Sequence, residues 1–392
     1  MKLELVATAT FGLEAVVRRE IEALGYKIIK TEDGRVTYMG DERAVVRSNL
    51  WLRSADRVYV KMAEFSAVTF EELFQQAGGI AWEDIIPVDG KFPVVGTSVK
   101  SELHSVPACQ SIVKKAVSAR LGGFYCREVL PEDGAAEYRI RFAAHKDRFL
   151  MLLDTSGEGL HKRGYRVQDV AAPMKETLAA ALVQLSFYRK DRMLVDTCTG
   201  SGTIPIEAAM IARNIAPGLG RNFASEAWDI IPAAVWKEER RLAFEAADYD
   251  GELNILAMDI DGRAIRAAKA NAEEAGVIDD IKFVKTDMQR WQPEGEYGVI
   301  LTNPPYGERI GDRGQIEGIY TKLAAVLRKN PTWSMFMITT DKDVELKYFG
   351  RKADRRRKLY NGRLETQFYQ YHGVRPARSE HPAGEQDHRD EE

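Results

Sequence analysis

Cysteine, histidine and long apolar runs are scarce in this chain of 392 residues. The three cysteines, Cys109, Cys126 and Cys198, show neither the spacing of a metal site nor a disulfide framework, and the six histidines are scattered. No run is long and apolar enough to span a membrane, and Glu4 interrupts the segment where a signal peptide would need its apolar core. These absences predict a cytoplasmic protein with no bound metal.

Two nucleotide-binding motifs are also absent from the glycine-containing stretch Asp196–Thr203, Asp-Thr-Cys-Thr-Gly-Ser-Gly-Thr. A dinucleotide fingerprint needs a third glycine three positions after Gly202, where Pro205 stands, and no Gly-Lys-Ser/Thr follows to form a P-loop. The apolar run before the stretch and the helical spacing after it predict a strand, a tight turn and a helix. A glycine turn with an acid at its mouth suits an uncharged or cationic group, and S-adenosylmethionine fits this description.

A second motif, Asn303-Pro304-Pro305-Tyr306, follows a predicted buried strand over 297–302. Because prolines lack an N–H, the strip offers mainly acceptors. The Asn303 side-chain oxygen and the Pro304 carbonyl could hold the two hydrogens of an exocyclic amine, and the Tyr306 ring could stack on a base that has left its own stack. The alternative is a proline turn that only closes the strand.

Together the two motifs resemble those of class I methyltransferases that act on nucleobase amines with S-adenosylmethionine. Ser98–Ser101, the predicted helix from Pro107, and Gly159–Arg166 are similar to the RNA-binding module of THUMP-containing methyltransferases and its junction with the catalytic domain. The resemblance covers nearly the whole chain. It is strongest to the guanine-N2 methyltransferases of 23S ribosomal RNA, without the second methyltransferase domain that some bacterial relatives carry.

The resemblance implies an α/β fold: a Rossmann-like class I methyltransferase domain with a mostly parallel seven-stranded sheet, preceded by α+β ferredoxin-like and THUMP modules. The predicted boundaries are 1–65 for the ferredoxin-like domain, 66–166 for the THUMP domain, 167–378 for the methyltransferase domain and 379–392 for an acidic disordered tail. Residues 214–250 form an insertion longer than the fold needs, with no assigned role.

The same resemblance implies the site residues. The catalytic motif is Asn303, Pro304, Pro305 and Tyr306. Asp196 is expected to interact with the methionine ammonium of the cofactor, Asp259 with the ribose hydroxyls and Asp287 with the adenine amine, whereas the alternative for Asp287 is the cap of a short turn. The full set expected to line the cofactor is Thr177, Asp196, Cys198, Gly200, Ser201, Gly202, Thr203, Asp259, Asp287, Met288 and Asn303.

The formal net charge of −3 does not predict a nucleic-acid-binding protein, but its distribution is uneven. Residues 380–392 hold six acids and one arginine. Two basic clusters lie elsewhere, at Lys162, Arg163 and Arg166 and at Arg351, Lys352 and Arg355–Lys358; either can be a solvated face. We predict that Lys162, Arg163 and Arg166 contact an RNA substrate.

Several functions remain open from the sequence. The favoured prediction is transfer of a methyl group to a guanine N2 amine in 23S ribosomal RNA. The alternatives are guanine-N2 methylation of transfer RNA, adenine-N6 methylation of RNA, and a non-catalytic RNA-binding or assembly factor.

Overall fold

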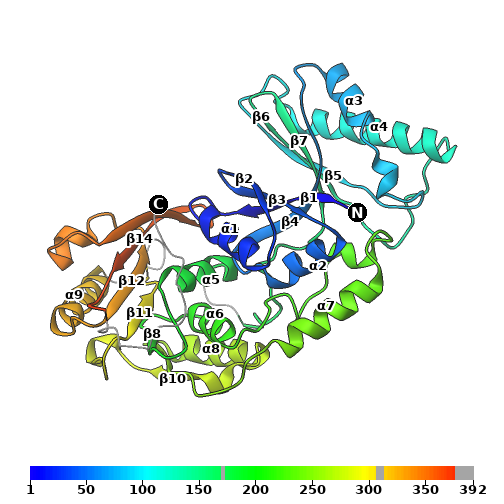
Figure 1. Cartoon of the computed structure of the whole chain (residues 1–392). Coiled ribbons are helices and arrows are strands. Elements are labelled where there is room, and N and C mark those ends of the chain that lie inside the picture. Colours follow the sequence, from blue (N-terminus) through cyan, green and yellow to red (C-terminus); the bar gives the residue numbers. More distant parts are fainter. Residues whose placement is uncertain (169–172, 306–312, 376–392) are drawn as a thin grey trace, which may run out of the picture.

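The computed structural model describes residues 1–168, 173–305 and 313–375. These residues form two lobes, each built around a seven-stranded sheet, with helices α1 and α2 of the first lobe facing α5 and α7 of the second (Figure 1). None of the described helices combines the length and the apolar character that a membrane crossing requires.

The N-terminal lobe joins the two predicted small modules through one continuous sheet, in the order β2-β3-β1-β4-β7-β6-β5. The twelve-residue strand β4 (Ala55–Ser66) pairs antiparallel with β1 (Leu3–Ala9) on one side and with β7 (Arg148–Asp154) on the other. The alternation of β1, with Leu5 and Ala7 buried, turns its apolar side chains to a common core. The remaining elements are α1 (Glu14–Ala23), β2 (Ile28–Glu32), β3 (Arg35–Gly40), α2 (Glu42–Trp51), α3 (Phe70–Gly78), β5 (Val94–Val99), α4 (Val106–Tyr125) and β6 (Ile140–His145).

The C-terminal lobe has the strand order β10-β9-β8-β11-β12-β14-β13. Strands β8 to β12 are parallel and β14 is antiparallel to both of its neighbours, which confirms the predicted mostly parallel seven-stranded sheet. Chain order reverses between β8 (Leu194–Asp196) and β11 (Val299–Thr302), and ligands of open α/β sheets bind at such a point, beyond the carboxyl ends of the strands.

The other elements of this lobe follow the alternation of strand and helix. They are α5 (Glu176–Leu185), α6 (Thr203–Ala212), α7 (Ala233–Glu245), β9 (Ile255–Asp259), α8 (Gly262–Glu274), β10 (Ile281–Lys285), α9 (Arg313–Lys329), β12 (Ser334–Thr339), β13 (Arg355–Asn361) and β14 (Leu364–Tyr371), with short 3₁₀ turns at Ala224–Ala227, Ile278–Asp280 and Met288–Arg290.

The insertion over 214–250 packs against the N-terminal lobe. Trp228 stacks on Tyr138 with ring centroids 5.2 Å apart, and Phe223 stacks on Trp236 at 5.4 Å. All four rings belong to the apolar core of the first lobe. The insertion therefore joins the lobes through apolar packing, a role that the sequence did not reveal.

Candidate active site

The two motifs meet at the carboxyl ends of neighbouring strands. Leu194 and Val195 of β8 pair with Val299 and Ile300 of β11, so the glycine loop and the Asn-Pro-Pro strip leave the sheet side by side. A hydrogen bond of 3.0 Å from the Thr197 hydroxyl to the Thr302 hydroxyl joins the two chain segments. Residues more than 100 positions apart therefore lie next to each other at one edge of the sheet.

The glycines are required by the geometry of the loop. Gly200 and Gly202 adopt φ angles of +53° and +83°, which side chains disfavour. A Cβ atom on Gly202 would also lie 2.9 Å from Cβ of Ala268 on α8. This close approach sets the start of α6 tightly against α8.

Two carboxylates, Asp196 buried and Asp259 half-buried, hold the loop in shape. Asp196 is 1% exposed and accepts a hydrogen bond from the Cys198 amide, while Asp259 at the end of β9 accepts one of 2.9 Å from the Gly200 amide. Burial raises the pKa of Asp196 to about 7 and also raises the pKa of Asp259. Two carboxyl groups with weakened ionisation beneath one loop favour a cationic ligand, because a positive charge offsets their desolvation.

Three buried oxygens at this site have no hydrogen-bond partner among the described residues. They are the hydroxyls of Thr177 and Thr199 and the side-chain oxygen of Asn303. Buried polar atoms are normally paired, and leaving one unpaired costs about 1–3 kcal/mol. Each can accept a hydrogen bond, so the site is prepared for a ligand that brings N–H or O–H donors.

The other residues predicted to bind the cofactor differ in their contacts and burial. Asp287 caps the turn Met288–Arg290 by accepting from the Gln289 amide at 2.9 Å, which is the alternative considered from the sequence. Met288 is buried. Burial raises the pKa of the Cys198 thiol to about 12, so this cysteine stays protonated and is a poor nucleophile. Tyr306 lies outside the described residues.

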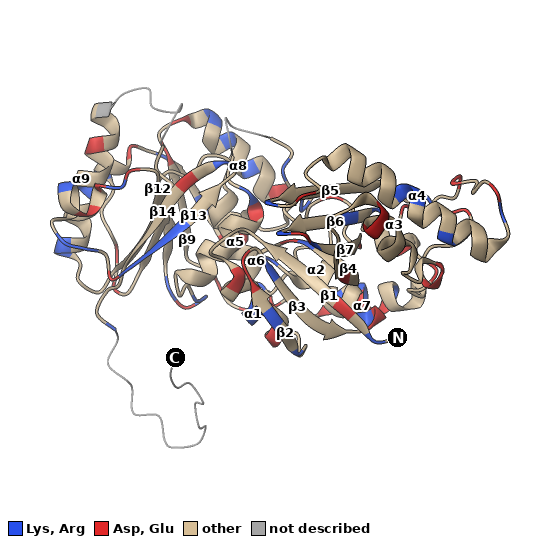
Figure 2. Cartoon of the chain, turned by 90° about the horizontal axis from the view of Figure 1, so that it is seen from above, with Lys and Arg blue, Asp and Glu red and all other residues tan. Residues whose placement is uncertain are grey.

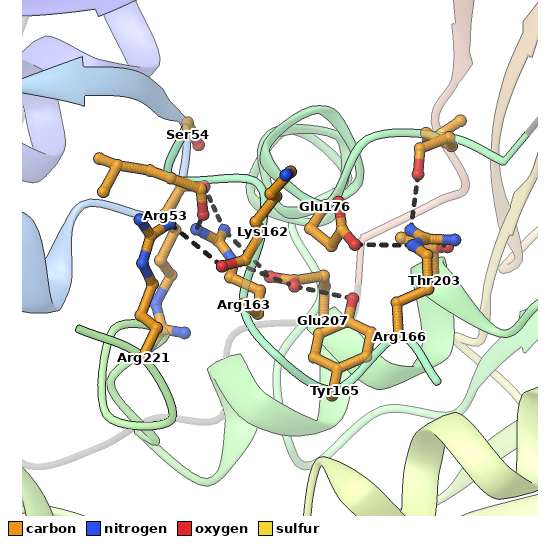
Figure 3. Close-up of polar contacts among 12 residues, drawn as sticks. Arg53, Ser54, Lys162, Arg163, Tyr165, Arg166, Glu176, Thr203, Glu207 and Arg221 are labelled. Carbon is orange, nitrogen blue, oxygen red and sulfur yellow. Dashed lines mark hydrogen bonds and ion pairs between the residues drawn. The ribbon is translucent and has the colours of Figure 1, made fainter. Parts of the chain in front are cut away.

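At the junction between the lobes, Arg163 is buried and does not fit the prediction that it contacts RNA. The Arg163 side chain is 2% exposed and pairs with Glu207, which is fully buried, at 3.4 Å. It also donates to the carbonyls of Leu160 and Arg53, at 2.6 and 2.5 Å (Figure 3). A buried guanidinium with these partners is not presented to RNA; Arg163 instead links the lobes from inside. Lys162 remains 57% exposed and pairs with Glu158.

Arg166 contacts the glycine loop directly. Its guanidinium donates to the hydroxyls of Ser201 at 3.0 Å and Thr203 at 3.1 Å, and it pairs with Glu176 at 2.8 Å (Figure 3). The predicted loop residues Ser201 and Thr203 therefore turn their hydroxyls toward the junction. This arginine connects the segment leaving the N-terminal lobe with the loop that begins α6.

Asn271 is a residue of this network that the sequence interpretation missed. It is fully buried on α8, accepts from the Val167 and Gln168 amides, and donates to the Ser201 carbonyl at 3.0 Å. A signal was present in the sequence, because Asn271 is the polar member of an otherwise alanine-rich face of α8. Among the described residues, no group of three or more histidine, cysteine or acidic side chains could hold a metal ion.

Comparison with known families assigns all three parts of the chain. Residues 4–59 match the RlmL ferredoxin-like domain, residues 67–154 match the THUMP domain, and residues 163–370 match the RMKL-like methyltransferase domain.

Two curated relatives are similar over most of this chain. The "Putative RNA methyltransferase YpsC" of Bacillus subtilis (strain 168) is 49% identical over 96% of this chain and 98% of its own length. The ribosomal RNA large subunit methyltransferase K/L of Syntrophotalea carbinolica is 32% identical over 94% of this chain, which spans 53% of that longer protein.

Two solved structures share the fold. A "predicted N6-adenine-specific DNA methylase" from Listeria monocytogenes str. 4b F2365 superposes with a TM-score of 0.90 at 47% identity, covering 95% of this chain and 97% of that one. The structure described as "SMU.472, a putative methyltransferase complexed with SAH" gives a TM-score of 0.90 at 42% identity, covering 96% and 99%. The predicted cofactor, S-adenosylmethionine, agrees with this set of relatives. The chain belongs to the RMKL-like methyltransferase family, with a ferredoxin-like domain and a THUMP domain preceding its catalytic domain.

Proposed function

We propose that this methyltransferase transfers a methyl group from S-adenosylmethionine to the exocyclic N2 amine of a guanine in 23S ribosomal RNA. The THUMP domain and the identity to YpsC support an RNA substrate. The 32% identity to a ribosomal RNA large subunit methyltransferase supports ribosomal RNA in particular.

The observation that carries the proposal is the free acceptor of Asn303. Its side-chain oxygen is buried, has no partner among the described residues, and lies one residue beyond β11, next to the glycine loop. Pro304 and Pro305 have no backbone N–H group. No donor of these two residues therefore competes with a ligand for the acceptors of the strip. An amine with two hydrogens complements this arrangement.

The residues at the loop also fit the cofactor. Thr177 and Thr199 offer buried acceptors, and Asp196 and Asp259 favour a positive charge. When bound, S-adenosylmethionine supplies a methyl group activated by its sulfonium. The expected contacts of Asp196, Asp259 and Asp287 with ammonium, ribose and adenine belong to this proposal.

The chain contributes positioning more than acid-base chemistry. Asn303 and the Pro304 carbonyl hold the two amine hydrogens, so the nitrogen lone pair faces the methyl group in line with the bond that breaks. In this transfer the N–C bond would form as the S–C bond breaks, and the methylated nitrogen, cationic at that point, would release its proton to water. No strong base is required at the moment of transfer. Tyr306 is proposed to stack on the displaced base.

Adenine N6 is the second candidate, because it is also an exocyclic amine and the similar Listeria protein is described as an adenine methylase. The test is mass spectrometry of nucleosides from fractionated RNA of cells with and without this chain. Loss of N2-methylguanosine from the 23S fraction is expected. Loss from transfer RNA would change the substrate, loss of N6-methyladenosine would change the base, and unchanged RNA would favour the non-catalytic alternative.

A further inference from the structure

A basic hollow, which we call the basic seam, runs between helix α1 of the N-terminal lobe and the methyltransferase lobe. It consists of two cavities of about 970 and 410 Å³ that share Arg19 and Gln184 in their walls. The first continues toward α2 and α7, and the second toward β13, whose first half is rich in lysine and arginine (Figure 2). Seven arginines and three glutamates line the seam: Arg18, Arg19, Arg43, Arg47, Arg53, Arg355, Arg357, Glu20, Glu22 and Glu239.

Only part of this positive charge is neutralised within the protein. Arg43 and Arg47 share Glu239, at 3.2 and 3.6 Å, and Arg18 pairs with Glu22. Glu20 already accepts from the amides of residues 53 and 54, from the Ser54 hydroxyl and from Gln184. Among the residues that the structure describes, no carboxylate forms an ion pair within 4.0 Å of the guanidinium groups of Arg19, Arg53, Arg355 and Arg357.

Three residues in the walls of the two cavities carry buried N–H donors that have no partner among the described residues. Nη1 of Arg53 is buried without a partner in the first, and Nε of Arg357 and Nε2 of Gln370 are buried without a partner in the second, within the described parts of the chain. Arg53 is 8% exposed and Gln370 1%. All three atoms can only donate, so a ligand that fits the seam must bring acceptors.

Like charges are also held close together here. Burial and the nearby guanidinium groups of Arg355 and Arg19 lower the pKa of Arg357, and burial lowers the pKa of Arg53 to about 10. Arg19 belongs to the ferredoxin-like domain, whereas Arg355 and Arg357 belong to the end of the catalytic domain. An anion bound between them would relieve this repulsion.

We propose that the basic seam binds the phosphodiester backbone of the RNA substrate, an inference that rests on the proposed function. Phosphate oxygens are anionic acceptors, and forked guanidinium groups bind them in pairs. Phe187, 54% exposed, lines the second cavity and offers a ring on which a base can stack.

The position of the seam indicates which RNA it would hold. Gln184 in the seam and Thr177 at the cofactor site lie seven residues apart on α5, about 10 Å along the helix axis. The seam residue Gln184 and the candidate cofactor residue Thr177 thus lie toward opposite ends of one helix. RNA that enters both the seam and the active site must extend over several nucleotides, so the seam adds affinity for an extended or structured RNA.

The test compares two double variants that remove the same charge. Arg19→Gln with Arg355→Gln changes two exposed seam residues, whereas Arg328→Gln with Lys329→Gln changes two exposed cations at the end of α9. Affinity for transcribed 23S ribosomal RNA is measured at several salt concentrations, with thermal unfolding as the folding check. We expect the seam variant to bind at least about tenfold more weakly, and the slope of log affinity against log salt to fall by roughly 1.5. The α9 variant should keep most of the affinity.

Equal slopes for the seam variant and the wild type would overturn the proposal, as would wild-type RNA binding that does not depend on salt. The assay requires no methyl transfer, so it can fail or succeed independently of the nucleoside analysis. If the seam instead binds the acidic segment 376–392 of the same chain, a peptide of that sequence will bind protein truncated after 375. In that case the seam variant keeps wild-type RNA affinity, which also overturns the proposal.

Discussion

At the scale of single residues, three buried oxygens without hydrogen-bond partners among the residues that the structure describes give the clearest evidence for a ligand site. The buried oxygens of Asn303, Thr177 and Thr199 have no partner in the described chain, although all three belong to a loop, helix or strip around one sheet edge. Paired, they would only stabilise the fold. Unpaired, they favour a polar ligand, and the Asn303 oxygen in particular favours one with an N–H or O–H donor.

The role of Asn303 gives the most direct prediction. Asn303→Ala removes the acceptor that orients the amine, and misplacing reacting groups by about 1 Å can cost roughly 100-fold in rate. We therefore expect kcat to fall by at least about 100-fold while calorimetry shows nearly unchanged affinity for S-adenosylmethionine. Asn330→Ala, at an asparagine just after α9 whose side chain donates to the Val326 carbonyl, is the matched control. Normal turnover by Asn303→Ala would exclude the proposed mechanism.

Asp196 predicts a pH dependence of cofactor binding. Its pKa of about 7 in the free protein means that the carboxyl group is largely neutral at pH 6 and ionised at pH 8. A cationic ligand favours the ionised form, so affinity for S-adenosylmethionine should rise from pH 6 to pH 8 by up to about tenfold. Calorimetry at both values tests this, with Asp196→Asn expected to remove the dependence. Equal affinities of the wild type at pH 6 and 8 would argue against an electrostatic role.

The same shift has a consequence for stability with the opposite sign. The folded state keeps the proton of Asp196 between its ordinary pKa of 3.8 and about 7, whereas the unfolded chain has lost it. The contribution of this residue to the stability of the ligand-free protein therefore decreases as pH rises through that range.

At the scale of elements, the start of α6 is held from three directions. Asp259 at the end of β9 accepts from Gly200, Asn271 on α8 donates to the Ser201 carbonyl, and Arg166 from the junction segment donates to Ser201 and Thr203. The glycine loop is thus fastened to the segment that leaves the N-terminal lobe.

Arg166→Lys tests this connection. Lysine keeps the charge but cannot span Glu176, Ser201 and Thr203 with one planar group. We expect affinity for S-adenosylmethionine to fall about tenfold, corresponding to ~1.4 kcal/mol. Arg189→Lys, the same change at an exposed residue just after α5, should leave that affinity unchanged. If Arg166 instead contacts RNA, as the sequence suggested, RNA affinity will fall while cofactor affinity is kept.

At the scale of the whole molecule, the two lobes interlock. Leu13 and Val16 at the start of α1 belong to the core of the catalytic lobe, whereas Trp228 and Trp236 of the insertion belong to the core of the N-terminal lobe. Each lobe thus places apolar side chains in the other. We infer that the orientation of the RNA-binding lobe relative to the active site is held by packing as well as by the junction.

Glu207→Gln tests the buried part of the junction. The change leaves the guanidinium of Arg163 buried without a counter-charge, which typically costs about 3–5 kcal/mol. We expect a marked fall in the urea midpoint, and a smaller loss when Arg163→Met is added because the buried charge is then gone. Glu238→Gln, at an exposed ion pair on α7, is the control and should not shift the midpoint. Equal midpoints for Glu207→Gln and wild type would contradict the structural role.

Much of the catalytic lobe could be predicted because its signals are local. The glycine positions, the acid that ends β9 and the prolines after β11 follow from turn geometry and donor chemistry within a few residues. Asp261 likewise caps the start of α8 by accepting a hydrogen bond from the Arg263 amide, as an aspartate just before a helix typically does. The role of the insertion over 214–250 could not be predicted, because its tryptophans pack against residues that are distant in the sequence. Trp228 stacks on Tyr138, and the insertion contributes to the core of the other lobe.

The sequence by itself therefore determined the class of the fold and the positions of the glycine loop and the Asn-Pro-Pro strip, since these depend on the conformational limits of glycine and proline and on donors and acceptors close together in the chain. Only the tertiary structure decided what each arginine does. Arg163 is buried against Glu207, Arg166 holds the glycine loop, and Arg19 lines one cavity together with Arg355, which is more than 300 positions away in the sequence. Whether a charge is buried, paired or exposed depends on neighbours that folding brings from distant parts of the sequence.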